Sequence, residues 1–420
     1  MSSRSLNALQ AAALLVSASY GIGFLFGSGE LAVDHGMAGS AYGLATGCGM
    51  LLLATLAPSL WRLRLSMWEL FGQRFGGGLK TLVAVLSVVW MAGVLAAQIQ
   101  GGVAVLRLLG VAPAFAWVGV LACCLAAARL RLGLASAVFA VLLVCSAAVL
   151  VHALLVHGGG AIYLEAPARL VADAGSFRAG ALLAMFVAVT ALVCTGTDYH
   201  QFVQSARAPA AAGWGCALAG VVLIFISFLP PAVVVAMQSA GALPPLLDAK
   251  QVIPVAVSQA AASLMPGLDV LLLVALSAAA LGSGAAILKT MAGAIAGAAA
   301  WVPAPLLRSP DLLALTVGAL LAAAGQGIVD TMVSANVVYI GSVGPVFLTL
   351  LVGRRLPAAS ARCSVVTGFI VTTGVQIASR IDQLPFDANL ASLVAGTSTA
   401  ALALGWRTAR TRGHRPKPLS

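Results

Sequence analysis

Glycine and serine gather in an apolar stretch near the start of the chain, where peptide groups could form a binding site. Between Ser17 and Glu30, glycine occupies positions 21, 23, 27 and 29, and serine occupies positions 17, 19 and 28. Glycine costs about 1 kcal/mol relative to alanine inside a helix, so this density needs a physical reason. One reason is an unwound helix whose bare carbonyl and amide groups line a site. The other is close packing of neighbouring helices, which small residues also allow.

A second polar stretch, Cys194 to Gln201, lies inside or at the cytoplasmic end of another apolar run. Two interrupted helices at corresponding places in inverted halves of a chain are the best sequence indication of a transporter's central site. We therefore predict that both stretches contribute to one site for a small organic solute. The candidate solute contacts are Tyr20, Gly23, Gly27, Glu30, Gln98, Thr195, Gly196 and Asp198.

Ionisable residues inside apolar spans are costly, and many of them are functional. Glu30 could hold a cation, a proton or a solute amine, or it could reach water at the outer surface. Lys289 could extend to the membrane interface or stand in a cation pathway. Asp198 and Asp330 lie near span ends, where contact with solvent is the favoured interpretation. Gln98 could contact the solute or form a hydrogen bond between helices.

Several other kinds of chemistry have no matching motif in this sequence. The five histidines and seven cysteines show no metal-ligand spacing, so no metal site beyond a possible Na⁺ is expected. No phosphate-binding loop of the ATPase type is present. No serine, histidine and acid set suggests an intramembrane hydrolase, so we expect neither an enzyme nor a cofactor. No basic stretch is also aromatic, which argues against a nucleic-acid partner despite the net charge of +11.

The composition places these residues in a membrane. Of the 420 residues, 61% are hydrophobic and only 8% are charged, whereas soluble domains carry about 25% charged residues. The apolar runs are continuous rather than alternating, so they predict helices and not a barrel. We predict an all-α polytopic membrane protein of about 12 transmembrane helices. The spans are 8–33, 38–60, 79–109, 114–129, 133–156, 179–203, 212–237, 267–299, 311–325, 328–352, 361–379 and 388–406.

The basic residues predict the orientation of these spans. Seventeen of the 23 lysine and arginine residues fall on one side, five fall on the other, and Lys289 lies within a span. Because basic residues stay in the cytoplasm, both termini are expected there, in a bacterial-type inner membrane with the lipid bilayer as a partner. The outer connections 157–178 and 238–266 are long, and the second should contain a helix over Ala249 to Met265 that does not span.

The spacing of the two interruptions predicts an internal symmetry. The first and sixth spans are five apart, so a five-helix unit starting at the sixth is inverted relative to the first. The third and eighth spans are the longest of their halves, as equivalent tilted helices would be. We therefore expect two inverted five-helix repeats, 8–156 and 179–352, plus two C-terminal helices in 361–406. A basic cytoplasmic tail, 407–420, follows, with an end expected to lack order.

At these residues the chain resembles the sodium:solute symporter family, whose members include proline and sugar symporters. The likeness covers about residues 8–380, and the order and spacing of its motifs make it more specific than any single motif. Met67 to Gly76 is similar to the family's Pro-Glu-Tyr-x-x-x-Arg-Phe-Gly segment. The other similar segments are Gly23 to Gly36, Ala96 to Gly102, Gln201 to Arg207 and Ala278 to Ala285.

This resemblance implies the leucine-transporter-type fold of the amino acid-polyamine-organocation superfamily. It also implies a sodium ion between the first and eighth core helices. The ion would be held by the carbonyls of Ala18, Gly21 and Ala280 and by the hydroxyl of Ser283, and the family's second hydroxyl falls on Gly284. The family's acid in the fifth core helix and its arginine near Gln201 have no counterpart here. Proton coupling through Glu30, or uncoupled transport with Lys289 in place of the ion, therefore stays open.

The sequence favours secondary active transport by alternating access, with symport of a small organic solute coupled to a cation. Sodium is favoured over the proton as the coupling ion. The main alternative is a transporter-like membrane sensor that binds solute and signals to a partner, although the short C-terminal tail offers no signalling domain. A membrane enzyme acting on lipid or isoprenoid is a third class, but it would need paired acids. The sequence indicates neither the solute nor the oligomeric state.

Overall fold

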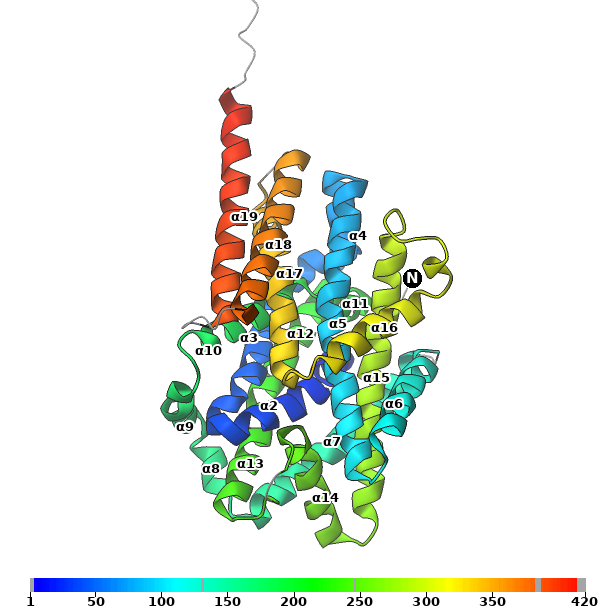
Figure 1. Ribbon diagram of the computed structural model, residues 1–420, viewed down its shortest axis with the longest axis vertical. Coiled ribbons are helices and arrows are strands. Elements are labelled where there is room, and N and C mark those ends of the chain that lie inside the picture. Colours follow the sequence, from blue (N-terminus) through cyan, green and yellow to red (C-terminus); the bar gives the residue numbers. More distant parts are fainter. Residues whose placement is uncertain (1–3, 130–131, 245–246, 355, 382–386, 414–420) are drawn as a thin grey trace, which may run out of the picture.

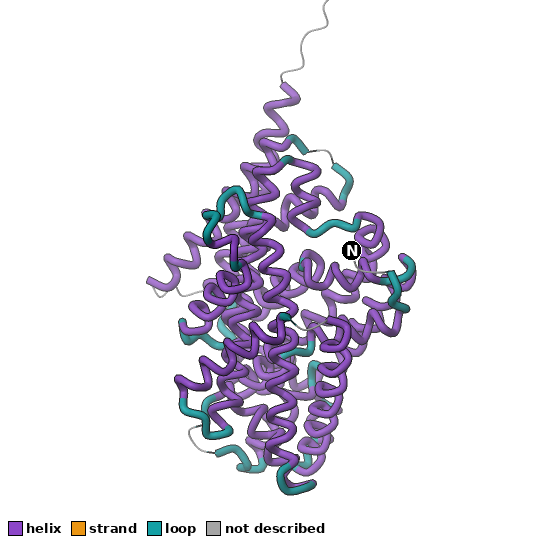
Figure 2. Tube along the Cα trace, turned by 90° about the vertical axis from the view of Figure 1, so that its right-hand side faces the viewer, coloured by secondary structure: helices purple, strands orange, loops and turns teal. Residues whose placement is uncertain are grey.

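The chain folds into an elongated bundle of helices (Figure 1). The computed structural model describes residues 4–129, 132–244, 247–354, 356–381 and 387–413. Figure 2 shows helices joined by loops, and the described residues contain no strand, only an isolated bridge between Leu6 and Ala206. All seven cysteines are free.

The helices follow one another with short connections. The first half contains α1 (Ala8–Ser19), α2 (Ile22–His35), η1 (Gly36–Ser40), α3 (Ala41–Leu63), α4 (Met67–Phe75), α5 (Gly77–Leu108), α6 (Pro113–Ala128), α7 (Leu132–Val156), α8 (Gly160–Leu164), α9 (Ala166–Asp173) and η2 (Ala174–Ser176). The second half contains α10 (Ala181–Thr195), α11 (Thr197–Ser205), α12 (Pro209–Ile226), α13 (Leu229–Ser239), η3 (Ala249–Gln251), α14 (Val252–Leu264), α15 (Leu268–Gly297), η4 (Leu306–Arg308), α16 (Pro310–Ala323) and α17 (Ile328–Leu351). The chain ends with α18 (Ala358–Ile381) and α19 (Ala388–Gly413).

Each predicted span coincides with one helix or with a pair of consecutive helices. Among the described residues, six stretches are long and apolar enough to cross a membrane, and shorter apolar helices lie between them. The chain is therefore a multi-pass membrane protein. The predicted seventh span is not one uninterrupted helix as expected, because it divides into α12 and α13 before Pro230 and Pro231. Proline lacks the amide that would continue the hydrogen-bond ladder, so a new helix begins there.

The two longest helices lie in equivalent places of the two halves, as predicted. α5 has 32 residues and α15 has 30, and they pack against each other. α5 also packs on α17, where Gly93 permits close approach: a Cβ atom there would lie 2.7 Å from Ala335 Cβ. This core pairs Trp90 of α5 with Tyr339 of α17, both fully buried, with ring centroids 6.0 Å apart.

The two ends of the molecule differ in structure. The predicted non-spanning helix is confirmed as α14, whose 13 residues are too few to cross a bilayer. It does not merely lie over the bundle, because Ile253 and Val257 are fully buried and Ile253 contacts α2 at Gly29. At the opposite end, α19 continues to Gly413, seven residues beyond the predicted end of its span (Figure 1). Residues 414–420 of the predicted tail lie outside the described residues.

Candidate functional site

The first predicted interruption is present as a break between α1 and α2. Tyr20 and Gly21 leave the helical conformation, with Gly21 at φ −85° and ψ −171°. The Tyr20 amide donates to the Val16 carbonyl at 2.7 Å, which closes α1. Within the described contacts, no backbone hydrogen bond reaches the carbonyls of Ala18, Ser19 or Tyr20. The end of α1 therefore presents bare carbonyl oxygens, as helix ends do.

The remaining glycines of this stretch belong to α2 and serve packing. A Cβ atom at Gly23 would lie 2.7 Å from the Met332 side chain, and one at Gly27 would lie 2.6 Å from Val329. The two interpretations of the glycine-rich stretch thus apply to different residues: an unwound backbone at Tyr20–Gly21 and close helix packing beyond it. Gly21 starts α2, because its carbonyl accepts from the amides of Phe24 and Leu25 at 3.1 and 2.9 Å.

Polar side chains of α5 and α15 surround the break. A Cβ atom at Gly21 would lie 3.2 Å from Ser283 Oγ and 3.3 Å from Gln98 Nε2. The structure therefore brings Gly21 and Ser283, which are predicted to hold sodium, next to Gln98, which is predicted to contact the solute. Gly284 faces Gln98 and Cys124: a Cβ atom added at Gly284 would lie 3.5 Å from Gln98 Cβ. Ala280 lies in α15 one turn before Ser283, and its side chain lies outside the described residues.

The second predicted interruption is present between α10 and α11. Gly196 alone leaves the helix, with φ −69° and ψ 120°. The carbonyl of Cys194, freed at the end of α10, contacts Nε2 of the buried His200 at 2.9 Å. Thr195 bonds back within its own helix, to the Ala191 carbonyl at 3.0 Å. The break therefore contains few free backbone groups, and its exceptional feature is a side chain.

That side chain is Asp198, in the first turn of α11. Its residue is only 9% exposed, and its Oδ1 has no hydrogen-bond partner within the described residues. A Cβ atom at Gly196 would lie 2.6 Å from this oxygen, so glycine leaves room for the carboxylate to fold over the break. The structure thus places Asp198 in the bundle and not at the solvated span end that the sequence suggested. Backbone amides of Asp198 and Tyr199 hydrogen-bond to the carboxylate, but one oxygen stays unpartnered among the described residues. Burying a charge with so few partners is costly, which suggests a functional role.

Three of the five tyrosines lie near Asp198, and a fourth, Tyr20, is connected to them through Phe24. Its carboxylate interacts electrostatically with the hydroxyls of Tyr42, Tyr199 and Tyr339. Tyr42 connects to the α1–α2 break through Phe24, which contacts Tyr42 and Tyr20 with ring centroids 6.5 and 5.2 Å apart. The hydroxyl group of Tyr20 is buried without a partner among the described residues, and that of Tyr339 is buried beside Ser87. We call Tyr20, Tyr42, Tyr199, Tyr339 and Asp198 the tyrosine cluster.

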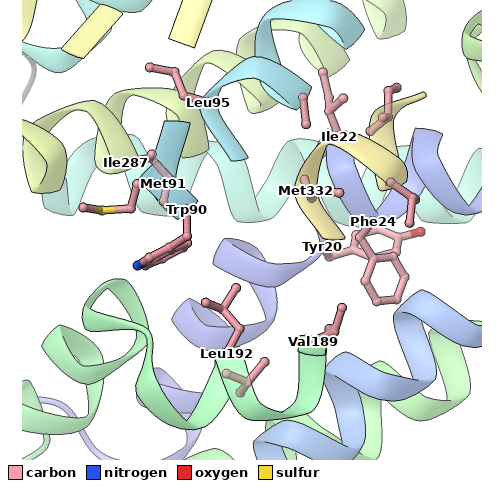
Figure 3. Packing of buried hydrophobic residues seen from close by; sticks show 14 of the residues in the cluster. Tyr20, Ile22, Phe24, Trp90, Met91, Leu95, Val189, Leu192, Ile287 and Met332 are labelled. Carbon is pink, nitrogen blue, oxygen red and sulfur yellow. The ribbon is translucent and has the colours of Figure 1, made fainter. Parts of the chain in front are cut away.

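The tyrosine cluster joins the two breaks. Figure 3 shows Tyr20, Phe24 and Met332 on one side and Trp90 on the other, with Leu192 of α10 between and below them. Asn336 of α17, one turn before Tyr339, is fully buried with both amide atoms unpartnered within the described residues. Neither Asn336 nor Tyr339 is among the candidates that the sequence predicts. An amide in the middle of an apolar span is a signal that could have found the first of them.

Glu30 lies away from the breaks, at the far end of α2. Its Oε2 accepts from the amide of Ile328 at 2.7 Å, which caps α17. The neighbouring Gln326 carbonyl accepts from Gln100 Nε2 at 3.2 Å and from Lys250 Nζ at 3.0 Å. We call Glu30, Gln100, Lys250 and residues 326–328 the outer contact, which ties α2, α5 and η3 to the start of α17. Asp330 lies beside it, with 3.4 Å from its Oδ2 to a Cβ atom added at Gly327.

Comparison with known proteins identifies the fold. The sequence matches no family model, and it shows no significant match to a curated protein. The structure resembles a Na⁺-coupled sialic acid symporter, with a TM-score of 0.64 and 15% identity over 98% of this chain and 97% of that one. It also resembles Mhp1, a nucleobase-cation-symport-1 family transporter, with a TM-score of 0.52 and 14% identity over 97% and 93% of the two chains.

A third similar structure is the manganese transporter of Eremococcus coleocola, with a TM-score of 0.52 and 14% identity over 98% of this chain and 88% of that one. All three similar structures have the leucine-transporter fold. Identities this low establish a shared fold alone. The predicted architecture is thereby confirmed: the chain is an all-α polytopic membrane protein of the leucine-transporter fold, with two inverted five-helix repeats followed by two C-terminal helices.

Proposed function

We propose that this chain is a secondary active transporter that carries a small organic solute across the membrane by alternating access. The observation that supports this most directly is the pair of helix breaks, Tyr20–Gly21 and Gly196, joined by a buried polar cluster. Broken helices that meet near mid-membrane give a solute both peptide groups and side chains to bind. The fold shared with known symporters is consistent with this role.

We further propose that transport is coupled to a cation, with sodium favoured over the proton. Sodium prefers hard oxygen ligands, and the Ala18 carbonyl and the Ser283 hydroxyl approach the same break from α1 and α15. The Gly21 carbonyl already accepts two amides at the start of α2, so it has limited capacity for an ion. The motifs that resemble the sodium:solute symporter family, quoted above, support the same assignment.

The solute would bind next to the proposed sodium position, on the side toward Gln98, Tyr20 and the second interruption at Thr195–Asp198. Gln98 Oε1 is buried without a partner among the described residues, so it can accept a hydrogen bond from a solute. The buried Asp198 carboxylate would bind a positive group during the transport cycle, either a proton or a solute amine. Gly23 and Gly27 would shape this side by keeping α2 close to α17, and not by direct contact.

The orientation that we propose follows the distribution of basic residues. Both termini lie in the cytoplasm, and the chain resides in the inner membrane of a bacterial-type cell. The end of the molecule that carries α4, α18 and the end of α19 is then cytoplasmic (Figure 1). The outer contact and α14 lie at the opposite, external side. Glu30 therefore belongs to the external closure of the molecule and not to the solute site.

Uptake by proteoliposomes under imposed gradients tests the proposed function. Purified protein is reconstituted and supplied with a panel of labelled amino acids, carboxylates and nucleobases under an inward sodium gradient, an inward proton gradient or neither. We expect one solute class to accumulate above its external concentration with the sodium gradient and to equilibrate without it. Accumulation of no solute, or accumulation that ignores both gradients, would contradict symport.

Two substitutions on neighbouring residues of α15 test the sodium assignment in opposite directions. Ser283→Ala removes a ligand, and it should raise the half-saturating sodium concentration for uptake about tenfold. Gly284→Ser adds the hydroxyl that the resemblance places at this position. A Cβ atom there would lie 3.5 Å from its nearest neighbour, Gln98 Cβ, so the side chain can be accommodated. This substitution should lower that concentration. The matched control is Ser277→Ala, because Ser277 is also buried in α15 but bonds to Leu273. Identical sodium titrations of all four proteins would remove sodium from this position.

A further inference from the structure

A long groove separates α10 from α19. Its volume is about 1780 Å³, and α3 and α17 form its floor. At one end, α10 and α19 touch, because the backbone at Gly180 lies against Leu390. At the other end, the lining residues are Thr195, Gly405 and Arg354. The lining of α10 runs from Leu183 to Thr195, roughly 18 Å at 1.5 Å per residue, slightly more than one leaflet of a bilayer.

Most polar side chains of the groove wall already have a hydrogen-bond partner. The threonine hydroxyls bond to backbone carbonyls: Thr190 to Ala45, Thr195 to Ala191, Thr349 to Pro345 and Thr397 to Leu393. Apart from Cys194, Ser398 and Arg354, the rest of the lining is apolar. The groove is open toward the surroundings, as the 57% exposure of Leu183 and the 62% exposure of Leu348 show. A polar solute would lose its hydration in this groove without replacement. An alkyl chain would lose nothing and would gain contact area.

Among the described lining residues, a single cation lies at the open end. Arg354 is the one charged residue among the described lining residues, and its exposed guanidinium has no ion pair or hydrogen bond in the described part of the chain. The only ion pair found there joins Arg169 to Glu165, in α9 and just before it. Arginine matches phosphate geometry with two parallel hydrogen bonds. The groove thus combines an apolar channel of about leaflet length with a phosphate-binding group at its mouth.

We infer that this groove holds one anionic phospholipid of the cytoplasmic leaflet, with its acyl chains between α10 and α19 and its phosphate at Arg354. The inference rests on the proposed orientation, which places Arg354 at the cytoplasmic surface. Basic residues at the cytoplasmic ends of grooves between transmembrane helices favour anionic lipid headgroups. A second copy of the chain would instead have to fill a concave apolar channel and pair its own acid with Arg354. The bound lipid would contact α10 next to the Gly196 break, so it could stabilise one position of that helix.

Native mass spectrometry of the full-length protein tests the inference without any transport assay. The protein is exchanged into detergent containing equal amounts of phosphatidylglycerol and phosphatidylcholine, and retained lipids are counted per chain. We expect one strongly retained phosphatidylglycerol. Arg354→Gln should reduce the preference for phosphatidylglycerol about fivefold, the effect of one basic residue near a charged lipid. Arg308→Gln, which changes another exposed arginine outside the groove lining, should leave the preference unchanged.

A pair of glycine substitutions tests the channel itself. Gly405 lines the groove and Gly374 lies exposed on α18, and a Cβ atom added at either one meets nothing within 4 Å. Gly405→Phe should therefore fill the groove and abolish retention of both lipids, whereas Gly374→Phe adds the same bulk and should retain them. Equal melting temperatures establish that both variants fold. Equal retention by the parent and Gly405→Phe, or dimers in place of lipid adducts, would overturn the inference. If the parent protein retains phosphatidylglycerol as expected but takes up no solute in proteoliposomes, the result would count against the proposed function and not against the lipid site.

Discussion

Asp198→Asn is expected to reduce concentrative uptake at least about 30-fold while leaving the melting temperature equal to or above that of the parent. Asparagine keeps the shape of the side chain over Gly196 but removes its charge, so it cannot hold a proton or pair with a solute amine. Losing one partner of a buried charge pair costs about 2 kcal/mol or more, which corresponds to that factor. In the resting protein the carboxylate is buried with one unpartnered oxygen, and backbone amides at the start of α11 bond to it. The amide oxygen of asparagine can still accept those bonds, so removing the charge should not destabilise the fold.

The opposite signs of the two effects make this prediction specific. A residue that only supports the structure would lose stability and uptake together, whereas functional groups are often kept at a cost in stability. The matched control is Asp311→Asn, because Asp311 also occupies the first turn of a helix, α16, but is exposed. Uptake and thermal unfolding are measured on the same preparations. Normal uptake by Asp198→Asn would remove the carboxylate from the mechanism, and a parallel loss of stability would assign it to the fold.

Glu30→Ala is expected to raise the ratio of the open to the closed state, at the side that we propose is external, tenfold or more. The Glu30 carboxylate accepts from the Ile328 amide at 2.7 Å and thereby joins α2 to the start of α17, on the side that we propose is external. A hydrogen bond to a charged group contributes about 1.5–3 kcal/mol, enough to shift a two-state equilibrium by that factor. The Lys250 and Gln100 bonds to Gln326 would remain, so the fold should persist.

The readout is the rate at which a membrane-impermeant maleimide labels a cysteine introduced at Ala104. This residue is 5% exposed, and its carbonyl accepts from Gln251 of η3 beneath the outer contact. Glu30→Gln serves as the matched variant, because its amide oxygen can still accept from Ile328, and its labelling rate should stay close to that of the parent. If the alanine variant labels no faster than the parent, the outer contact does not hold the molecule closed.

The sequence alone determined the architecture well, because the features that predict it are local along the chain. Span length, continuous hydropathy and the distribution of arginine depend on the bilayer as solvent, not on which helices become neighbours. The paired lengths of α5 and α15, and the breaks at Tyr20–Gly21 and Gly196, follow from the same local signals. Boundaries were less certain: α19 extends to Gly413, since arginine and alanine favour helix in water as well as in lipid.

The tertiary structure alone decided what each polar residue does. Gly21 and Gly27 are the same residue type in the same stretch, yet one lies at the break beside Ser283 and the other packs against Val329. Glu30 and Asp198 are both isolated acids in the sequence, but the first caps α17 and the second is buried among tyrosines from three helices. A side chain's environment depends on which neighbours the fold brings to it, and these come from positions up to 298 residues away. Composition and local spacing do not reveal which distant residues become neighbours. The sequence therefore identified the candidate residues, and the packing of the helices decided their roles.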